Sequence, residues 1–435
     1  MNKTDNLYKL DGKVNVGKAI PFGLQHVLAM FVANVTPIII LAGVVIQDPV
    51  LTARLVQNAM IVAGIGTLVQ LYPVWRIGSR LPVVMGISFT FLSLSIAIAS
   101  SQGMGTLMGA VIVGGIVEGL LGLFARYWMK IITPIIAATV VSGIGFSLLP
   151  IAANSFAGGQ GAADFGSSQN WIVGTVTLLS CLGFQVFAKG YLKSLSILCG
   201  LVIGYALAAI MGMVDISFEG VEVVALPKFV PFRPEFHLGA ILSIICIYLV
   251  SATETIGDTS DICESALKRA AKPGEISGSI ACDGFISTVA GLFGCTPITS
   301  FSQNAGLLTM THVVNRFAIG CGAAIMLVAG LFPVFGTILT SIPQPVLGGC
   351  TIMMFGSIIY SGFYMISKRR LGKRNMKIMS LSLSIGLGFS QVPAVFNVFP
   401  DMVKTVFAEN CVAIIFILAL LLDLVLPEEK EDVAE

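Results

Sequence analysis

Residues 81–90 read LPVVMGISFT, and residues 296–302 read TPITSFS. Each stretch combines a proline with β-branched or aromatic residues and small hydroxyl side chains, a pattern that predicts a short extended piece followed by a helix. An ordinary proline kink explains either stretch taken singly. Two such stretches in corresponding positions favour a ligand site, because broken backbone survives at membrane depth only where it lines a cavity in the protein.

The composition places these stretches in a lipid bilayer. Of the 435 residues, 56% are hydrophobic and only 11% are charged, and the mean hydropathy is +0.92. Soluble domains carry about 25% charged residues, so this chain could not cover a water-facing surface of its size. A soluble binding module is therefore excluded, and a net charge of +2 gives no reason to expect nucleic acid as a partner.

Apolar runs separated by turn residues or charges predict fourteen membrane spans, since a spanning helix needs about 20 apolar residues. Their expected positions are 20–43, 54–74, 81–100, 104–124, 128–150, 171–188, 194–214, 237–257, 276–294, 299–314, 317–340, 345–366, 375–392 and 405–426. Most of the 25 basic residues fall in the segments that this count places on one side, together with both termini. Because basic loops face the cytoplasm, the prediction is a multi-pass protein of the inner (cytoplasmic) membrane with cytoplasmic N- and C-termini.

Two pairs of short segments repeat about half a chain apart. Thr133–Ala138 aligns with Gln344–Gly349, and Ser88–Phe89 aligns with Ser300–Phe301. With seven spans in each half, the second half enters the membrane from the opposite side, which defines an inverted repeat. The predicted fold is an all-α polytopic membrane protein with 14 transmembrane segments in a 7+7 inverted repeat and short extended strands in spans 3 and 10.

Few ionisable side chains fall inside the predicted spans. Each is a functional candidate, because a carboxylate at the bilayer centre costs at least ~2.5 kcal/mol. They include His26 in span 1, Glu118 in span 4, Glu254 and Asp258 in span 8, and Asp283 in span 9. A carboxyl group in a low dielectric holds a proton more readily than in water, which suits a proton-coupled cycle.

Most of these residues have a plainer alternative. Asp258, near the cytoplasmic end of its span, could be solvated, and Asp283 could be a structural hydrogen-bond acceptor. Glu118, on a glycine-rich helix, could brace a helix contact, and His26 could pack against or orient a neighbour. Glu254 is the residue for which contact with a ligand is favoured most.

The segment Gln303–Gly306 adds two amide side chains beside the second interrupted span. An amide carries donors and an acceptor, so Gln303 and Asn304 can read a neutral heterocycle with alternating N–H and C=O edges. The nine cysteines include no Cys-x-x-Cys pair, and no zinc-protease, nucleophile-elbow or Walker A motif occurs. The expectation is a secondary transporter without a metal or cofactor, rather than an enzyme.

The chain resembles the nucleobase–ascorbate transporter family (nucleobase:cation symporter-2), and within it the xanthine and uric acid permeases. Residues 303–311, QNAGLLTMT, match the family signature Q/E-N-x-G-x4-T. The other similar motifs, spread over nearly the whole chain, are Gln25–His26 in span 1, GISF at 86–89 in span 3, SATETIGD at 251–258 in span 8 and the acid Asp283 in span 9.

The resemblance implies two domains, each assembled from both halves of the chain. Residues 1–127 (spans 1–4) and 237–340 (spans 8–11) would form a core domain, and residues 128–215 (spans 5–7) and 341–427 (spans 12–14) a gate domain. It also implies that substrate binds where spans 3 and 10 cross, that the core moves against the gate like an elevator, and that the protein is a homodimer.

The resemblance also implies roles for single residues. Glu254 would hydrogen-bond the N–H edge of a nucleobase, Gln303 would bond the opposite edge, and Phe89 would offer backbone and ring contact. Ser88 and Ser302, in the two interrupted spans, are expected at the same site. The residues expected to support the site and proton coupling are Asp283, Asn304, His26 and Asp258.

The expected substrate follows from the first residue of the signature. The glutamine at this position, Gln303, resembles the xanthine and uric acid members of the family, whereas the uracil members usually have glutamate at the same position. The predicted function is proton-coupled import of an oxidised purine, xanthine first and uric acid second. His312 departs from the arginine, lysine or glycine usual after the signature and leaves the exact purine open.

Two alternatives remain from the sequence. One is a uracil:proton symporter of the same fold. The other, less favoured, is an anion transporter of the sulfate-permease type, because the Glu254 carboxylate beside the site would repel an anionic substrate.

Overall fold

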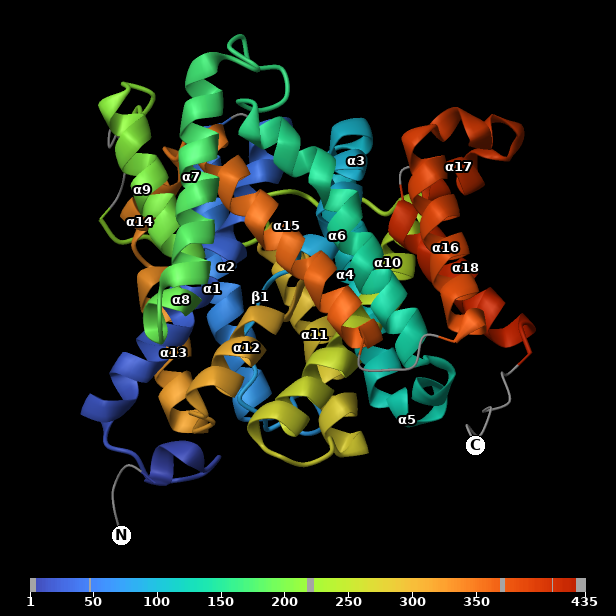
Figure 1. Ribbon diagram of the computed structural model, residues 1–435, viewed down its shortest axis with the longest axis horizontal. Helices are drawn as coiled ribbons and strands as arrows, with labels where there is room; N and C mark the ends of the chain where they lie inside the picture. The colour runs from blue at the N-terminus through green and yellow to red at the C-terminus, as the bar shows by residue number, and fades with distance from the viewer. Residues whose placement is uncertain (1–4, 47, 217–222, 368–371, 409, 428–435) are drawn as a thin grey trace.

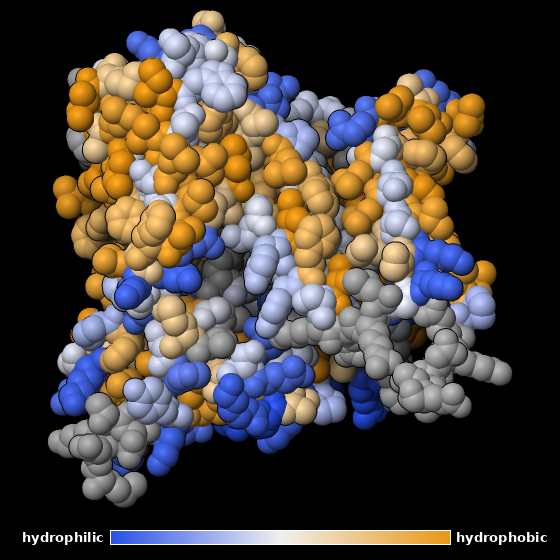
Figure 2. Space-filling view, viewed as in Figure 1, coloured by the Kyte–Doolittle hydropathy of each residue, from blue (hydrophilic) through white to orange (hydrophobic). Residues whose placement is uncertain are grey.

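The computed structural model describes residues 5–46, 48–216, 223–367, 372–408 and 410–427, arranged as a bundle of helices with two short strands near its centre (Figure 1). For eight residues within these ranges the structure describes the backbone but not the side chain: Asp5, Lys130, Gln303, Ala305, Thr309, Asp401, Met402 and Thr405. Hydrophobic side chains cover the helices through the middle of the molecule, and hydrophilic ones gather along the edge that carries the N-terminus (Figure 2).

The helices of the first half are α1 (Val16–Val45), α2 (Pro49–Leu71), α3 (Leu92–Gln102), α4 (Met104–Leu123), α5 (Ala125–Trp128), α6 (Pro134–Phe156), α7 (Ser168–Phe187), α8 (Tyr191–Ser194) and α9 (Ser196–Ile210). Those of the second half are α10 (Leu238–Asp261), α11 (Pro273–Leu292), α12 (Ser302–Thr311), α13 (Arg316–Ala329), α14 (Pro333–Thr340), α15 (Gln344–Ser367), α16 (Lys373–Gln391), α17 (Asp401–Phe407) and α18 (Cys411–Val425). Short non-α turns are η1 (Asp5–Tyr8), η2 (Phe89–Phe91), η3 (Met129–Ile131), η4 (Ile262–Ala266) and η5 (Pro393–Val398).

Seven of the described helices are long and apolar enough to cross a membrane, or eight if the bent pair α13–α14 counts as one span. The predicted polytopic, mainly helical architecture is confirmed, while the count of fourteen spans stays a prediction. Two of the predicted spans, 317–340 and 405–426, are not single continuous helices. The first is bent by 83° between α13 and α14, because Pro333 begins a new helix. The second is divided into α17 and α18, with the Asn410 side chain capping α18.

Helices from the two halves pack backbone against backbone. A Cβ atom on Gly348 of α15 would lie 2.1 Å from the backbone of Phe156, and one on Gly362 would lie 2.7 Å from that of Ser142. The positions rise along α15 as they fall along α6, so the two helices run antiparallel. Small residues allow such close approach between membrane helices.

The pair α4 and α11 repeats this arrangement. A Cβ atom on Gly122 would lie 2.3 Å from the backbone of Ala281, and one on Gly284 would lie 2.1 Å from that of Gly119. Each of the two pairs joins one helix from each half of the chain. The inverted repeat itself stays a prediction.

The strands β1 (Met85–Ile87) and β2 (Ile298–Ser300) form an antiparallel pair, with Gly86 opposite Thr299. Each lies in one of the two stretches for which extended backbone was predicted. Gly86 has no room for a side chain, because a Cβ atom there would lie 2.4 Å from the Phe301 ring. The helical turn η2 and α3 follow β1, and α12 follows β2, so two helices begin near the centre of the molecule.

Candidate functional site

A cavity of about 230 Å³ lies beside the strand pair. One wall consists of the chain after each strand, residues 87–90 and 299–302, together with Glu254 of α10. The facing wall comes from α6, α7 and α15 and consists of Val141, Gln185, Ser357, Ile358, Tyr360 and Ser361. This volume is below the roughly 300 Å³ at which sites for drug-sized ligands begin, so it suits a small molecule.

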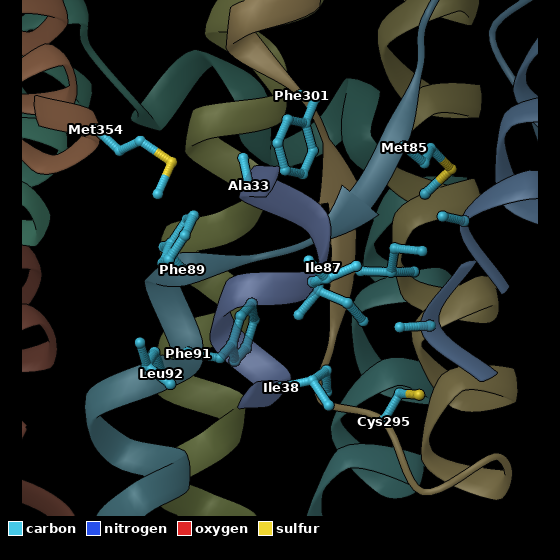
Figure 3. Close-up of a cluster of buried hydrophobic side chains, with 14 of the residues drawn as sticks. Ala33, Ile38, Met85, Ile87, Phe89, Phe91, Leu92, Cys295, Phe301 and Met354 are labelled. Carbon is cyan, nitrogen blue, oxygen red and sulfur yellow. The ribbon is translucent and has the colours of Figure 1, made fainter. Parts of the chain in front are cut away.

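Two helix beginnings lie at this cavity. The Ser88 side chain caps η2 by accepting a hydrogen bond from the Thr90 N–H at 3.3 Å, and α12 begins at Ser302. The first N–H groups of a helix have no partner within it and carry partial positive charge. Phe89 lines the same cavity and faces Met354 of α15 (Figure 3). Its ring packs edge-on against that of Phe355, with 5.1 Å between the ring centroids. The site thus places two helix beginnings beside an aromatic face.

Glu254 brings a carboxyl group to the same cavity. The Thr90 hydroxyl donates to its Oε2 at 2.9 Å. Within the described part of the chain no hydrogen bond reaches Oε1, so this oxygen is available to a ligand. Among the described residues that line the cavity there is no lysine or arginine. The cavity therefore combines a carboxyl group with uncharged polar groups.

Asp258 lies one helical turn beyond Glu254. It accepts hydrogen bonds from the Ser302 hydroxyl at 2.8 Å and 2.9 Å, one to each carboxyl oxygen. Asp258 is therefore hydrogen-bonded within the protein rather than merely solvated. The bond ties α10 to the first residue of α12, and it engages the Ser302 hydroxyl with Asp258.

Asp283 of α11 is fully buried behind β2. It accepts hydrogen bonds from the Thr255 hydroxyl at 2.6 Å, the Gln70 side-chain amide at 3.1 Å and the Ser300 N–H at 3.3 Å. These partners come from α10, α2 and β2. Asp283 is therefore the acceptor that fixes β2 to the helices behind it, which agrees with the structural alternative and places it one layer from the cavity.

His26 of α1 and Asn304 of α12 lie together, both buried. The Asn304 amide donates to the His26 carbonyl oxygen at 3.3 Å and lies 3.2 Å from His26 Nδ1. Neither residue lines the cavity, so the pair supports α12 from behind. The side chain of Gln303, expected to bind the substrate, lies outside the described residues.

Two residues that hold β1 in place were missed from the sequence. The Asn34 side-chain oxygen accepts from the Ile87 N–H at 2.8 Å, and the Thr67 hydroxyl oxygen accepts from the Met85 N–H at 3.0 Å. Asn34 could have been found, because it is the single polar amide in the apolar run that follows His26 in span 1. The polar residues of the facing wall gave no comparable signal, since small polar side chains are common in membrane helices.

Replacing Asn34 with leucine is expected to weaken the site by leaving the Ile87 N–H buried without a partner. Such a loss costs about 1–3 kcal/mol. The expected result is a lower unfolding temperature in detergent and reduced transport. Gln169→Leu, which removes an exposed amide in the first turn of α7, is the control and should behave like the wild type. Equal stability of the two variants would contradict the role given to Asn34.

The fold and the site are those of a membrane transport protein: a polytopic helical bundle with a small polar cavity between its helices. The chain belongs to the Permease family, whose Xan_ur_permease model matches residues 17–395. The predicted resemblance is thereby confirmed, and the protein is a permease rather than an enzyme.

Two similar relatives and one solved structure extend this comparison. The xanthine permease of Bacillus subtilis (strain 168) is 34% identical over 403 residues, which cover 91% of each chain. The xanthine permease XanQ of Escherichia coli (strain K12) is 30% identical over 440 residues, covering 98% of this chain and 94% of that one. The transmembrane domain of the cyanobacterium bicarbonate transporter BicA matches with a TM-score of 0.62 over 92% of this chain and 98% of that one. Its sequence identity is 15%, so this likeness concerns the fold alone.

Proposed function

We propose that the protein imports an oxidised purine nucleobase, xanthine first and uric acid second, together with protons. The observation that carries the proposal is the position of Glu254 in a small cavity beside two helix beginnings. A purine such as xanthine presents N–H groups, which a carboxyl oxygen accepts, and C=O groups, which hydroxyl or N–H donors of the cavity wall would satisfy. The names of the two xanthine permeases support the same substrate class.

The composition of the cavity also separates this proposal from anion transport. The fold is shared with a bicarbonate transporter, but an anion bound here would meet the Glu254 carboxylate without a lysine or arginine among the described lining residues. The carboxylate and the bound anion would repel each other, because both carry negative charge. A neutral heterocycle has no such penalty. Uracil, which carries the same kinds of edges on a smaller ring, is the second candidate.

The proposed mechanism is alternating access of the elevator type. The core domain would comprise residues 1–127 and 237–340, and the gate domain residues 128–215 and 341–427. This division is supported by the cavity, whose strand-side wall comes from the first set and whose facing wall comes from the second. Asp283, Asp258, Asn304 and His26 would keep the core rigid and take part in proton coupling. We also propose a homodimer in the inner membrane with both termini in the cytoplasm.

Uptake of radiolabelled xanthine by cells that lack their own purine permeases tests this function. The expected result is accumulation that unlabelled xanthine and uric acid suppress strongly, that uracil suppresses weakly, and that bicarbonate and sulfate leave unchanged. A protonophore should abolish accumulation, whereas replacement of sodium by potassium should not. Stronger competition by uracil than by any purine would favour the second candidate, and dependence on sodium would contradict proton coupling.

A further inference from the structure

Glu118 of α4 is a buried carboxyl group to which the mechanism above gives no role. Its side chain is fully buried, and neither carboxyl oxygen accepts a hydrogen bond of standard geometry from a described residue. A carboxylate that only braced a helix contact would be expected to accept hydrogen bonds across that contact. An ionised carboxylate without partners is strongly disfavoured in such surroundings, whereas the protonated acid is tolerated.

The helices packed against α4 are α11, α10 and α3. The titratable groups that face Glu118 from them are Asp283 of α11 and Glu254 and Tyr248 of α10, while the described residues of α3 include no titratable side chain. Asp283 and Glu254 are both acidic, and the Tyr248 hydroxyl is already engaged, donating to the Val111 carbonyl oxygen at 3.1 Å. Glu118 therefore has two other carboxyl groups near it and, among these described neighbours, no cation.

Ser251 of α10 connects Glu118 to the site. Its hydroxyl is fully buried and interacts with the Glu118 carboxyl, although no hydrogen bond of standard geometry to it is formed within the described part of the chain. On the same helix, Glu254 follows three residues later and Thr255 four, so all three lie on neighbouring parts of one face. Thr255 donates to Asp283. One face of α10 thus carries Ser251, which interacts with Glu118, Thr255, which donates to Asp283, and Glu254, which lines the cavity.

We propose that Glu118 is a proton-binding group of the transport cycle. Its carboxyl group takes up a proton and gives it back by way of Ser251 and Glu254, whose side chain lines the cavity. Negative charge on Glu254 or Asp283 favours proton uptake by Glu118. Fewer of the three carboxyl groups are therefore ionised at one time than if they lay far apart. This inference rests on the proposed proton-coupled import of a purine.

The test uses purified full-length protein in liposomes and two measurements. Xanthine counterflow without any gradient reports substrate binding and movement, whereas accumulation driven by an imposed difference of about one pH unit reports proton coupling. Each coupled proton multiplies the attainable accumulation roughly tenfold per pH unit. Glu118→Gln keeps the shape of the protonated acid but cannot exchange the proton. Its expected result is counterflow within about twofold of wild type and accumulation about tenfold lower.

Glu264→Gln changes an exposed glutamate and should match the wild type in both measurements. If Glu118→Gln accumulates as much xanthine as the wild type, the proposal is overturned, because the Glu118 carboxyl of the wild type would then stay protonated through the whole transport cycle. Glu118→Gln could reach the membrane and still lose counterflow. In that case, recovery of counterflow and accumulation in Glu118→Asp supports the proposal. If Glu118→Asp recovers neither, Glu118 has only a packing role and the proposal is overturned. Absence of xanthine counterflow in the wild type would instead refute the proposed function.

Discussion

Replacing Glu254 with alanine is expected to reduce xanthine uptake by roughly 10- to 150-fold while the protein remains in the membrane. The carboxylate is the acidic acceptor of the cavity, and hydrogen bonds to a charged group contribute about 1.5–3 kcal/mol, where each 1.4 kcal/mol is a factor of ten. Initial rates of radiolabelled uptake measure the effect, with the amount of membrane-inserted protein determined in parallel on a tagged chain.

Two matched variants interpret this result. Glu264→Ala removes an exposed carboxylate a short distance along the chain and should leave uptake unchanged. Glu254→Gln keeps the size of the side chain and is expected to lose most of the uptake, because a neutral amide accepts an N–H less strongly than a carboxylate. Uptake by Glu254→Ala at the wild-type rate would exclude Glu254 from substrate binding.

Replacing Gly284 with valine is expected to prevent stable packing of α11 against α4. A Cβ atom at this position would lie 2.1 Å from the backbone nitrogen of Gly119, and backbone cannot move aside as the end of a flexible side chain can. Overpacking a core costs about 1–3 kcal/mol, and a clash with backbone belongs at the upper end. Thermal unfolding of the detergent-solubilised protein, together with its size-exclusion profile, measures the loss.

The control for this substitution lies on the same helix. Gly274, in the first turn of α11, has no atom within 4 Å of the place where a Cβ would stand. Gly274→Val should therefore retain an unfolding temperature close to that of wild type. If Gly284→Val were as stable as Gly274→Val, the two helices would be farther apart than described.

The membrane architecture could be predicted because hydropathy and span length report directly on burial in lipid. The two stretches with strands could be predicted because Pro82 and Pro297 each precede β-branched residues in an apolar run. The bend between α13 and α14 could not, since both helices are apolar and a change of direction leaves the mean hydropathy unaltered. Only the position of Pro333 hinted at it.

The candidate site was predictable to a similar extent. The rarity of charge in lipid singled out Glu254 and Asp283 without any knowledge of contacts. What each carboxyl binds could not be read from the sequence, because Thr90 and Gln70 lie far from them along the chain. The same limit concealed the surroundings of Glu118, which depend on three packed helices.

The β1–β2 pair also affects biosynthesis of the protein. The two strands are separated by almost half the sequence, so at about 5–20 residues per second a ribosome needs roughly 10–40 seconds to advance from one to the other. During that delay the first strand lacks its partner, and unpaired backbone is poorly tolerated in lipid. The insertion machinery must shelter this nascent segment until the second strand emerges, and the binding site is therefore a late product of translation.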